Sequence, residues 1–221
     1  PTHPSSTGAS ARVRHMAAGL LAAGHEVHFL HLQQALRADD TAMRQWWNGR
    51  LHVFRSLSPA SFVGRGRRKL IRVMGKTFHR NLPVDSYFDP EADRFFRALL
   101  DADGFDVVIV SYVFYSKLLE SVPSSIRTLI DTHDVFSDRF RLYREHGQAN
   151  EFFSTGLAEE GWPLDRADGV LAIQGWDADH FRSLTTKPVS VVGHLAPISI
   201  PARPEPASEH AGAILFVGGP M

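Results

Sequence analysis

Short, mostly apolar runs recur along the chain without polar alternation, and segments of helical length separate them. Four of these runs are residues 106–111, 127–131, 169–173 and 189–192. Strands that are covered by helices on both faces have this pattern, whereas strands with one face in water alternate between apolar and polar residues. The intervening segments can supply the crossover helices that parallel strands need. The sequence therefore predicts an α/β fold with a doubly wound parallel sheet.

The start of the chain predicts a loop, a helix, a tight turn and a strand, in that order. The polar residues 1–8 lead into apolar positions at helical spacing over 13–21, and Gly24 stands where a C-cap glycine belongs. Residues 26–32 are then rich in β-branched and aromatic side chains, as a strand requires. In a βαβ unit a strand precedes such a loop. We therefore expect the chain to begin just after the first strand of its sheet.

The middle of the chain continues this alternation. Asp89 as N-cap and Pro90 at the first helical position predict a helix with an apolar face, which Gly104 ends. Further helices are predicted over residues 114–120, 151–166 and 176–184, and another strand is predicted within residues 46–57.

Composition excludes several classes of protein. The chain has 221 residues, 43% of them hydrophobic, and no Cys, which is unlike a disordered, a collagen-like or a disulfide-built protein. Its 24 Lys and Arg balance its 24 Asp and Glu, which argues against a dedicated nucleic-acid binder. No apolar stretch reaches the ~20 residues that span a bilayer. We take a cytoplasmic location as the default expectation.

The last part of the chain predicts a domain boundary. Residues 197–208 are rich in Pro and lack periodicity, which indicates an interdomain linker, and residues 213–217 form a new apolar run. We therefore expect one domain over residues 1–194, a linker over 195–212, and the start of a truncated second domain at 213–221.

The loop at Gly8 favours an anion. Its Thr-Gly-Ala-Ser sequence resembles the nucleotide loop of short-chain dehydrogenases, but the further glycines of that loop are missing. Gly8 at a helix N-terminus, with Arg12 and Arg14 just inside the helix, still suits a phosphate or carboxylate. The alternative is that Gly8 only turns the chain and that both arginines are solvated.

The most polar strand exit is residues 131–139, which contain three Asp, one His and one Arg. His133 there could bind a hydroxyl group or transfer a proton, with a neighbouring carboxylate holding its tautomer. The alternative is that Asp131 and Asp134 cap the next helix and that His133 fills the turn.

Metal sites are not predicted. His25, His28 and His31 lie three residues apart, and on a strand this spacing sends neighbouring side chains to opposite faces. The pairs at residues 101–103 and 177–179 imitate an Asp-x-Asp metal motif, but they lie at helices, where solvated side chains explain them better.

One strongly basic segment covers residues 65–80, with seven Lys and Arg and no acidic residue. Arg65, Arg68, Arg72 and Lys76 recur at steps of three or four residues, and apolar residues lie between them, which predicts a basic amphipathic helix. Such a helix suits an anionic membrane surface or a polyprenyl-phosphate acceptor. The alternative is a surface helix whose apolar stripe packs on the sheet.

Taken in order, these segments resemble a known family. The N-terminal half of bacterial GT-B glycosyltransferases, of the retaining, family-4-like group, has a Pro/Ser/Gly loop and an Arg-bearing helix at its start. The other matching segments are Ala-Gly-His-Glu-Val at 23–27, Asp-Thr-His-Asp-Val at 131–135, Leu-Asp-Arg-Ala-Asp at 164–168 with the strand to Gln174, and Ile-Leu-Phe-Val-Gly at 214–218. The resemblance covers essentially the whole chain.

The resemblance implies a Rossmann-like, acceptor-side domain of a two-domain hexosyltransferase-type enzyme. Its donor is a nucleotide-diphosphate sugar, its acceptor is a glycan or a polyprenyl-linked molecule in cell-surface polysaccharide synthesis, and its chemistry needs no metal or other cofactor. It acts in the cytoplasm, with a peripheral place at the inner face of the membrane. We expect His133 and Asp134 to be catalytic, and we expect substrate contacts from Gly8, Ser10, Arg12, Tyr112, Arg139 and Gln174.

Two other functions stay open at this point. One is a noncatalytic module of the same fold that binds carbohydrate or lipid head groups, and the other is a sugar-nucleotide epimerase. Because the second domain carries most of the donor site in this family, we expect the chain alone to be inactive.

Overall fold

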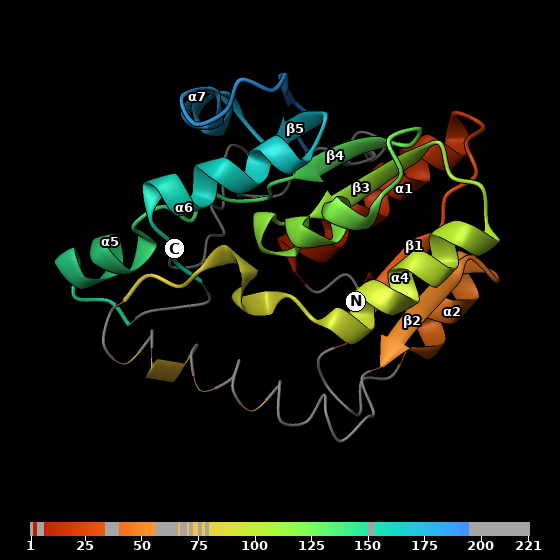
Figure 1. Cartoon of the computed structure of the whole chain (residues 1–221), viewed down its shortest axis with the longest axis horizontal. Helices are drawn as coiled ribbons and strands as arrows, with labels where there is room; N and C mark the ends of the chain where they lie inside the picture. Colours follow the sequence, from red (N-terminus) through yellow and green to blue (C-terminus); the bar gives the residue numbers. More distant parts are fainter. Residues whose placement is uncertain are drawn as a thin grey trace, which may run out of the picture.

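The computed structural model alternates helices and strands along the chain (Figure 1). It describes residues 2–3, 7–33, 40–55, 66, 70, 73–74, 77, 80–149 and 153–194. The strands are β1 (Phe29–Gln33), β2 (Leu51–Arg55), β3 (Val107–Ser111), β4 (Arg127–Asp131), β5 (Gly169–Ala172) and β6 (Val189–Val191). The α-helices are α1 (Gly8–Ala22), α2 (Thr41–Trp47), α4 (Pro90–Ala102), α5 (Arg139–Glu145), α6 (Leu157–Gly161) and α7 (Gly175–Arg182). The 3-10 helices are η1 (Val84–Tyr87), η2 (Val113–Ser121) and η3 (Trp162–Arg166).

Every strand pair in the described residues is parallel. β1 pairs with β2 in one sheet, and the second sheet has the order β3-β4-β5-β6. Helices connect the strands, because a parallel pair needs a long crossover rather than a hairpin. The predicted α/β fold with parallel strands is confirmed.

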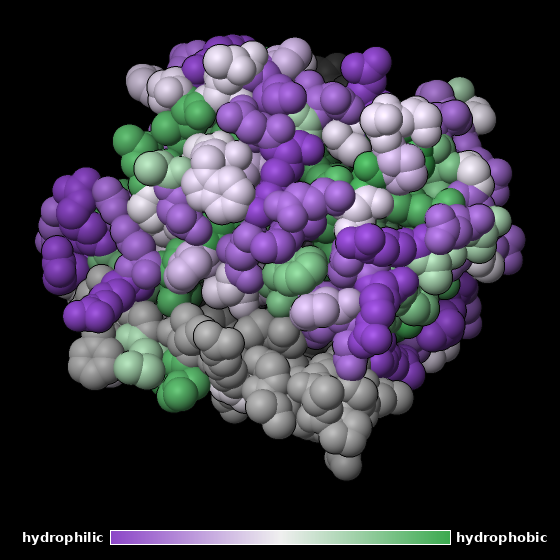
Figure 2. Space-filling view, viewed as in Figure 1, coloured by the Kyte–Doolittle hydropathy of each residue, from purple (hydrophilic) through white to green (hydrophobic). Residues whose placement is uncertain are grey.

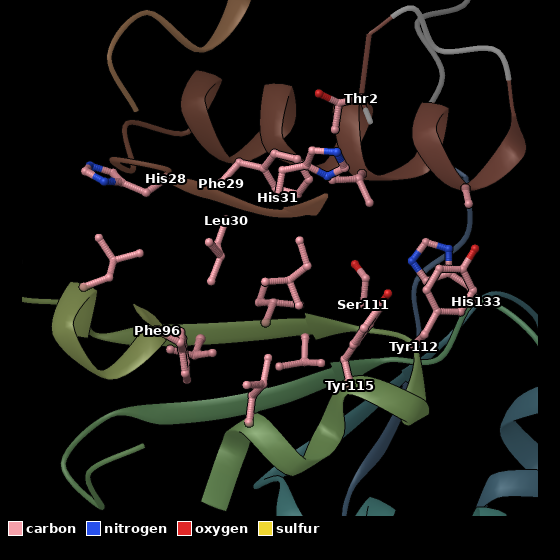
Figure 3. Close-up of a pocket in the computed structure, with 18 of the residues that line it drawn as sticks. Thr2, His28, Phe29, Leu30, His31, Phe96, Ser111, Tyr112, Tyr115 and His133 are labelled. Carbon is pink, nitrogen blue, oxygen red and sulfur yellow. The ribbon is translucent and has the colours of Figure 1, made fainter. Parts of the chain in front are cut away.

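An apolar cavity of about 460 Å³ separates β1 from β3, and side chains of both strands line it. Figure 3 shows the two strands running in the same direction on either side of the cavity. Their carboxyl ends therefore lie on the same side of the molecule. Among the described residues, no strand lies between β1 and β3.

The core has two parts. The larger part covers the four-stranded sheet and contains a group of aromatic rings, with Phe114 and Phe136 at 5.3 and 5.4 Å from Phe153 between ring centroids. The smaller part packs Met43 and Trp47 of α2 and Ala17 of α1 against β1. Each sheet is thus held by its own apolar cluster.

Local signals explain several element ends. The Asp89 side chain accepts a hydrogen bond from the Glu91 N–H at 3.0 Å, and Pro90 is the first residue of α4, as predicted. Gly24 has a φ of +89°, which suits the predicted turn after α1. The strands expected near residues 107, 127, 169 and 189 are all present.

Other elements differ from the prediction. The helix expected at 114–120 is the 3-10 helix η2, because spacing of apolar residues at i and i+3 fits both helix types. The helix expected over 151–166 is instead α6 followed by η3, since Pro163 lacks the N–H needed to continue α6. The strand expected within 46–57 is confined to β2.

The two tryptophans of that segment belong to α2. Trp47 is buried and stacks on Phe29 at 5.1 Å between ring centroids, so tertiary packing decides its conformation. Asn48 and Gly49, both with positive φ, then end the helix.

Several predictions fall outside the described residues. These are the linker at 195–212, the second-domain start at 213–221, and the basic side chains Arg65, Arg68, Arg72 and Lys76. Within the part of the chain that is described, no helix combines the length and the hydrophobicity needed to cross a membrane. On the face shown in Figure 2, hydrophilic residues predominate and hydrophobic ones form small groups between them.

Candidate functional site

Polar side chains gather at the carboxyl ends of β3 and β4. The N–H of Tyr112 donates to the carbonyl oxygen of Asp131 at 2.8 Å, and the N–H of Thr132 donates to the carbonyl oxygen of Leu171 at 3.0 Å. These bonds continue the parallel ladder beyond the strand ends. The sheet therefore fixes the loops at the edge where ligands of open α/β sheets bind.

A buried ion pair joins α1 to β4 at this edge. Arg12 Nη2 lies 2.7 Å from Asp131 Oδ1, and Arg12 Nε donates to both carboxylate oxygens at 2.9 and 3.0 Å. Arg12 Nη1 donates to the carbonyl oxygens of Val192 at 2.7 Å and Gly193 at 3.1 Å. Arg12 is 2% exposed. The predicted direct contact between Arg12 and a substrate anion does not fit this burial; the guanidinium instead holds Asp131.

His133 lies beside the same carboxylate. Its Nε2 atom is 3.0 Å from Asp131 Oδ2 but is poorly aligned, so this buried nitrogen has no hydrogen-bond partner among the described residues. Burial raises the pKa of Asp131, but the neighbouring His133 and Arg12 outweigh burial and lower that pKa below its ordinary value. Asp131 is therefore an anion at neutral pH and can orient the imidazole ring.

Tyr112 and His133 have backbone conformations that non-glycine residues seldom adopt. Their φ angles are +73° and +61°, and such conformations cost about 1–3 kcal/mol each. Their rings stack with 4.3 Å between centroids and 20° between planes. Two strained residues in contact at adjacent strand ends indicate that side-chain placement is favoured here over local stability.

The hydroxyl of Tyr112 keeps its proton over the physiological range. Burial raises the pKa of Tyr112 to about 12, and the negative charges of Asp134 and Asp131 add to this effect. The phenol is therefore able to donate a hydrogen bond at this edge.

Asp134 and Arg139 extend the site towards α5. Arg139 Nη2 lies 3.7 Å from Asp134 Oδ1. Burial raises the pKa of Asp134 and outweighs the opposing effect of Arg139 and His133. A carboxyl group with a raised pKa exchanges its proton closer to neutral pH than an ordinary one does.

The alternative in which Asp131 and Asp134 cap the next helix does not hold. The N-cap of α5 is Asp138, whose side chain makes no capping hydrogen bond, and the first-turn N–H of Phe140 donates to Ser154 Oγ at 3.1 Å. The Asp131 carboxylate bonds to Arg12 instead.

The loop at the start of α1 is built by a capping box. The Thr7 Oγ1 accepts from the Ser10 N–H at 3.2 Å, and the Thr7 N–H donates to Ser10 Oγ at 3.1 Å. The predicted substrate contact of Ser10 therefore competes with its role in the cap. Gly8 is exposed with open space where a Cβ would stand, and the first turn of α1 has no acidic residue, so an anion can approach its N–H groups.

Gln174 is the N-cap residue of α7, at the end of β5. Its side chain is exposed and donates to Asp177 Oδ1 at 3.3 Å. The charge of Asp177 contributes to the raised pKa of Asp134, which places this helix start near the same group of residues.

The cavity between β1 and β3 reaches Tyr112 and His133. Figure 3 shows His133 and Tyr112 at one end of the cavity and His28 at the other. Most of its lining is apolar, from β1, β3 and α4. Tyr112 and His133 are thus the part of the lining that lies at the carboxyl edge of the strands.

Sequence reasoning did not assign a role to Glu160, which holds the loop after His133. This buried carboxylate accepts from the N–H of Phe136 at 2.7 Å and of Ser137 at 3.0 Å, and it lies 3.2 Å from His180 Nε2. The two adjacent acidic residues at 159–160 stand out in the sequence. The groups that bind Glu160 belong to other elements, so the sequence does not identify them. The Arg12–Asp131 pair, 119 residues apart, was missed for the same reason.

Comparison with known proteins identifies the family of this chain. A sequence model of the glycosyl transferase 4-like domain matches residues 7–193, which include α1, every described strand and all the residues gathered at the carboxyl edge. The comparison with curated proteins found no matching sequence. Because the family match covers far more than half of the chain, the chain belongs to the glycosyl transferase 4-like domain family.

Proposed function

We propose that this domain is the acceptor side of an enzyme that moves a hexose from a nucleotide-diphosphate sugar to a glycan or polyprenyl-linked acceptor in cell-surface polysaccharide synthesis. The family match supports transfer of a sugar. The observation that carries the proposal is the stacked, strained pair of Tyr112 and His133. Asp131, which is paired with Arg12, lies next to His133. Retention of stereochemistry and a transfer step without a metal rest on the resemblance alone.

The transfer step needs a group that accepts a proton and a group that stabilises the negative charge of the leaving diphosphate. The acceptor oxygen forms a bond to the anomeric carbon, the bond from that carbon to the diphosphate breaks, and the nucleoside diphosphate leaves with the electron pair. The hydroxyl proton of the acceptor goes to a base, for which Asp134 is the candidate, since burial raises its pKa. The N–H groups at the N-terminus of α1, at Gly8, are suited to stabilise the negative charge of the departing diphosphate.

His133 is proposed to bind the transferred sugar. Its buried Nε2 has no aligned partner within the described residues, and Asp131 at 3.0 Å favours one orientation of the ring. Tyr112, Arg139 and Gln174 are proposed to line the acceptor side. Ser10 and Arg12 act as positioning residues, because their polar atoms are used in the cap and the ion pair.

A second proposal concerns the segment at 65–80. The three large apolar residues described there, Leu70, Val73 and Met74, are 58%, 51% and 49% exposed. The alternative in which the apolar stripe packs on the sheet does not hold for these three side chains. Exposed apolar residues within a basic segment support peripheral docking on an anionic membrane.

Vesicles test this docking. Binding to vesicles with anionic lipid is expected to weaken with salt and to be lost when Arg68, Arg72 and Lys76 are changed to Glu. The matched control changes the exposed Arg141, Arg144 and Arg182 to Glu. Equal binding by both triple variants would contradict the proposal.

Sugar transfer itself is tested with a panel of nucleotide-sugars, using the chain alone and the protein with a donor-binding domain. We expect a glycosylated product only from the protein with the donor-binding domain. Release of an altered free sugar nucleotide would indicate an epimerase, and sugar binding without turnover would indicate a binding module. Transfer by the chain alone would contradict its expected inactivity.

A further inference from the structure

Two imidazoles and a carboxylate meet at the amino ends of β1 and β2. His28 precedes β1, His52 lies on β2, and Asp103 is the C-cap residue of α4. One ligand atom from each of these residues lies within 4.8 Å of the others. Three separate elements therefore supply the cluster, and the pairing of β1 with β2 fixes two of its members.

The distance between the two imidazoles is close to that between ligands of one metal ion. His28 Nδ1 and His52 Nε2 are 3.0 Å apart, and their ring planes differ by 16°. In a tetrahedral zinc site with Zn–N bonds of about 2.0–2.1 Å, two nitrogens lie about 3.3 Å apart. Small rotations of the two rings would bring the lone pairs onto a common ion.

A further carboxylate sets the tautomer of His28. Its Nε2 atom lies 3.1 Å from Glu26 Oε1, and a carboxylate only accepts, so Nε2 carries the proton and Nδ1 keeps its lone pair. Histidines that bind metals usually donate their second ring N–H to a carboxylate or carbonyl in this way. Without a metal, the proton between the two rings therefore belongs to His52 Nε2, which donates to His28 Nδ1. When an ion binds between the rings, His52 carries its proton on Nδ1 instead.

The imidazoles are partly shielded from water. His28 and His52 are both half-buried. Phe105 covers one side of His28, with its ring at 5.4 Å and nearly perpendicular.

We propose that His28, His52 and Asp103 bind one Zn²⁺ ion, with water in the fourth position and Glu26 as the carboxylate that orients His28. Two imidazole nitrogens and one carboxylate oxygen are ligands that suit Zn²⁺ and do not suit Mg²⁺ or Ca²⁺. Nothing in the proposed sugar transfer uses these residues. His28 and His133 lie at opposite ends of the cavity in Figure 3, so the ion would tie β1 and β2 to the end of α4 rather than take part in the transfer.

The sequence predicted no metal site at the histidines of this segment, whereas the proposed site uses one of them, His28. His25 and His31 are not members of the cluster, and the partners of His28 come from 24 and 75 residues further along the chain. Spacing within one segment therefore gave no signal of the site.

Zinc binding by the untagged chain is the test, because its readout does not depend on sugar transfer. Zn²⁺ is titrated into metal-free protein in competition with a chromophoric chelator, and the expected result is one equivalent bound. His52→Ala and Asp103→Asn are each expected to weaken the affinity at least ~10-fold, and Glu26→Gln by about 10–100-fold, as for other residues that orient a ligand. His25→Ala, an exposed neighbouring histidine, is the matched control and should bind as the wild type does.

Two results would overturn the proposal. One is a wild-type protein that binds no Zn²⁺ against the chelator, and the other is an equivalent that His52→Ala and Asp103→Asn both retain. Circular dichroism checks that each variant is folded. If His52→Ala does not fold, the zinc affinities of Asp103→Asn and Glu26→Gln test the proposal, since both substitutions keep the shape of the side chain. The visible spectrum of bound Co²⁺ is then compared between the wild type and these two variants.

Discussion

At the scale of single residues, the site depends on a carboxylate that is buried and fully engaged. Asp131 is 1% exposed and lies between Arg12 and His133. A buried ion pair contributes little net stability when intact, but removal of one partner leaves an uncompensated charge. The main role of this pair is therefore to keep Asp131 ionised and next to His133.

Removal of Arg12 tests this role. Arg12→Leu is expected to lower the free energy of unfolding by about 3–5 kcal/mol, because the buried Asp131 loses its counter-charge. Urea unfolding at neutral pH measures the change. Arg141→Leu is the control, since Arg141 forms an exposed pair with Glu145 and should change stability by about 0.5 kcal/mol or less. Equal effects of the two variants would contradict a structural role for the pair.

The pH dependence of this contribution has a definite sign. The folded pKa of Asp131 lies below its unfolded value, so the stability it contributes is complete above the unfolded pKa and is lost as the pH falls through the folded pKa. Arg12→Leu is expected to reduce this part of the acid dependence, as measured by urea unfolding at several pH values, while His133 stays beside the carboxylate.

Tyr112 provides a prediction at alkaline pH. Its pKa of about 12 exceeds the ordinary value of 10.0, so the folded protein holds the phenol proton after the unfolded chain has lost it. The stability that comes from this group is complete below pH ~10 and is lost as the pH rises towards 12. A spectrophotometric titration should show a phenol that ionises late, and Tyr112→Phe should abolish this late ionisation. Ionisation of all four tyrosines near pH 10 would contradict the burial of Tyr112.

At the scale of elements, the sequence predicted the helices and strands that are determined by interactions between residues close together in the chain. Asp89 and Pro90 mark the start of α4, and the apolar runs mark β3 to β6, because caps and burial act over a few residues. Trp47 did not follow its local propensity, since a stack on Phe29 of β1 holds it in α2. The functional residues divide in the same way. His133 and Tyr112 could be found as polar strand exits, whereas the link from Arg12 to Asp131 exists only in the folded chain.

The cavity between β1 and β3 provides a prediction about a strand. Both strands turn an unpaired edge towards it within the described residues, and its lining is mostly apolar. A β-branched strand joined ahead of residue 1 should pair with both edges and raise the melting temperature. A Gly/Ser extension of equal length is the control, since Gly is depleted in strands and neither residue has apolar surface to bury. Equal melting of the two extended chains would indicate that the cavity does not accept a strand.

At the scale of the whole molecule, the parallel sheets place α1 and the loops after β3, β4, β5 and β6 along one edge, and the chemistry follows from that placement (Figure 1). The family match covers this edge completely.

The most direct measurement is the rate of sugar transfer by the chain joined to a donor-binding domain, comparing wild type with His133→Asn. Asn tolerates the left-handed backbone at this position but lacks the imidazole ring. Loss of the imidazole that positions the sugar is expected to lower kcat/KM by about 10²-fold or more, while circular dichroism shows that the variant is folded. His146→Asn, an exposed histidine at the end of α5, should leave the rate unchanged. A His133→Asn enzyme that is folded and fully active would contradict the central claim that this residue acts on the substrate.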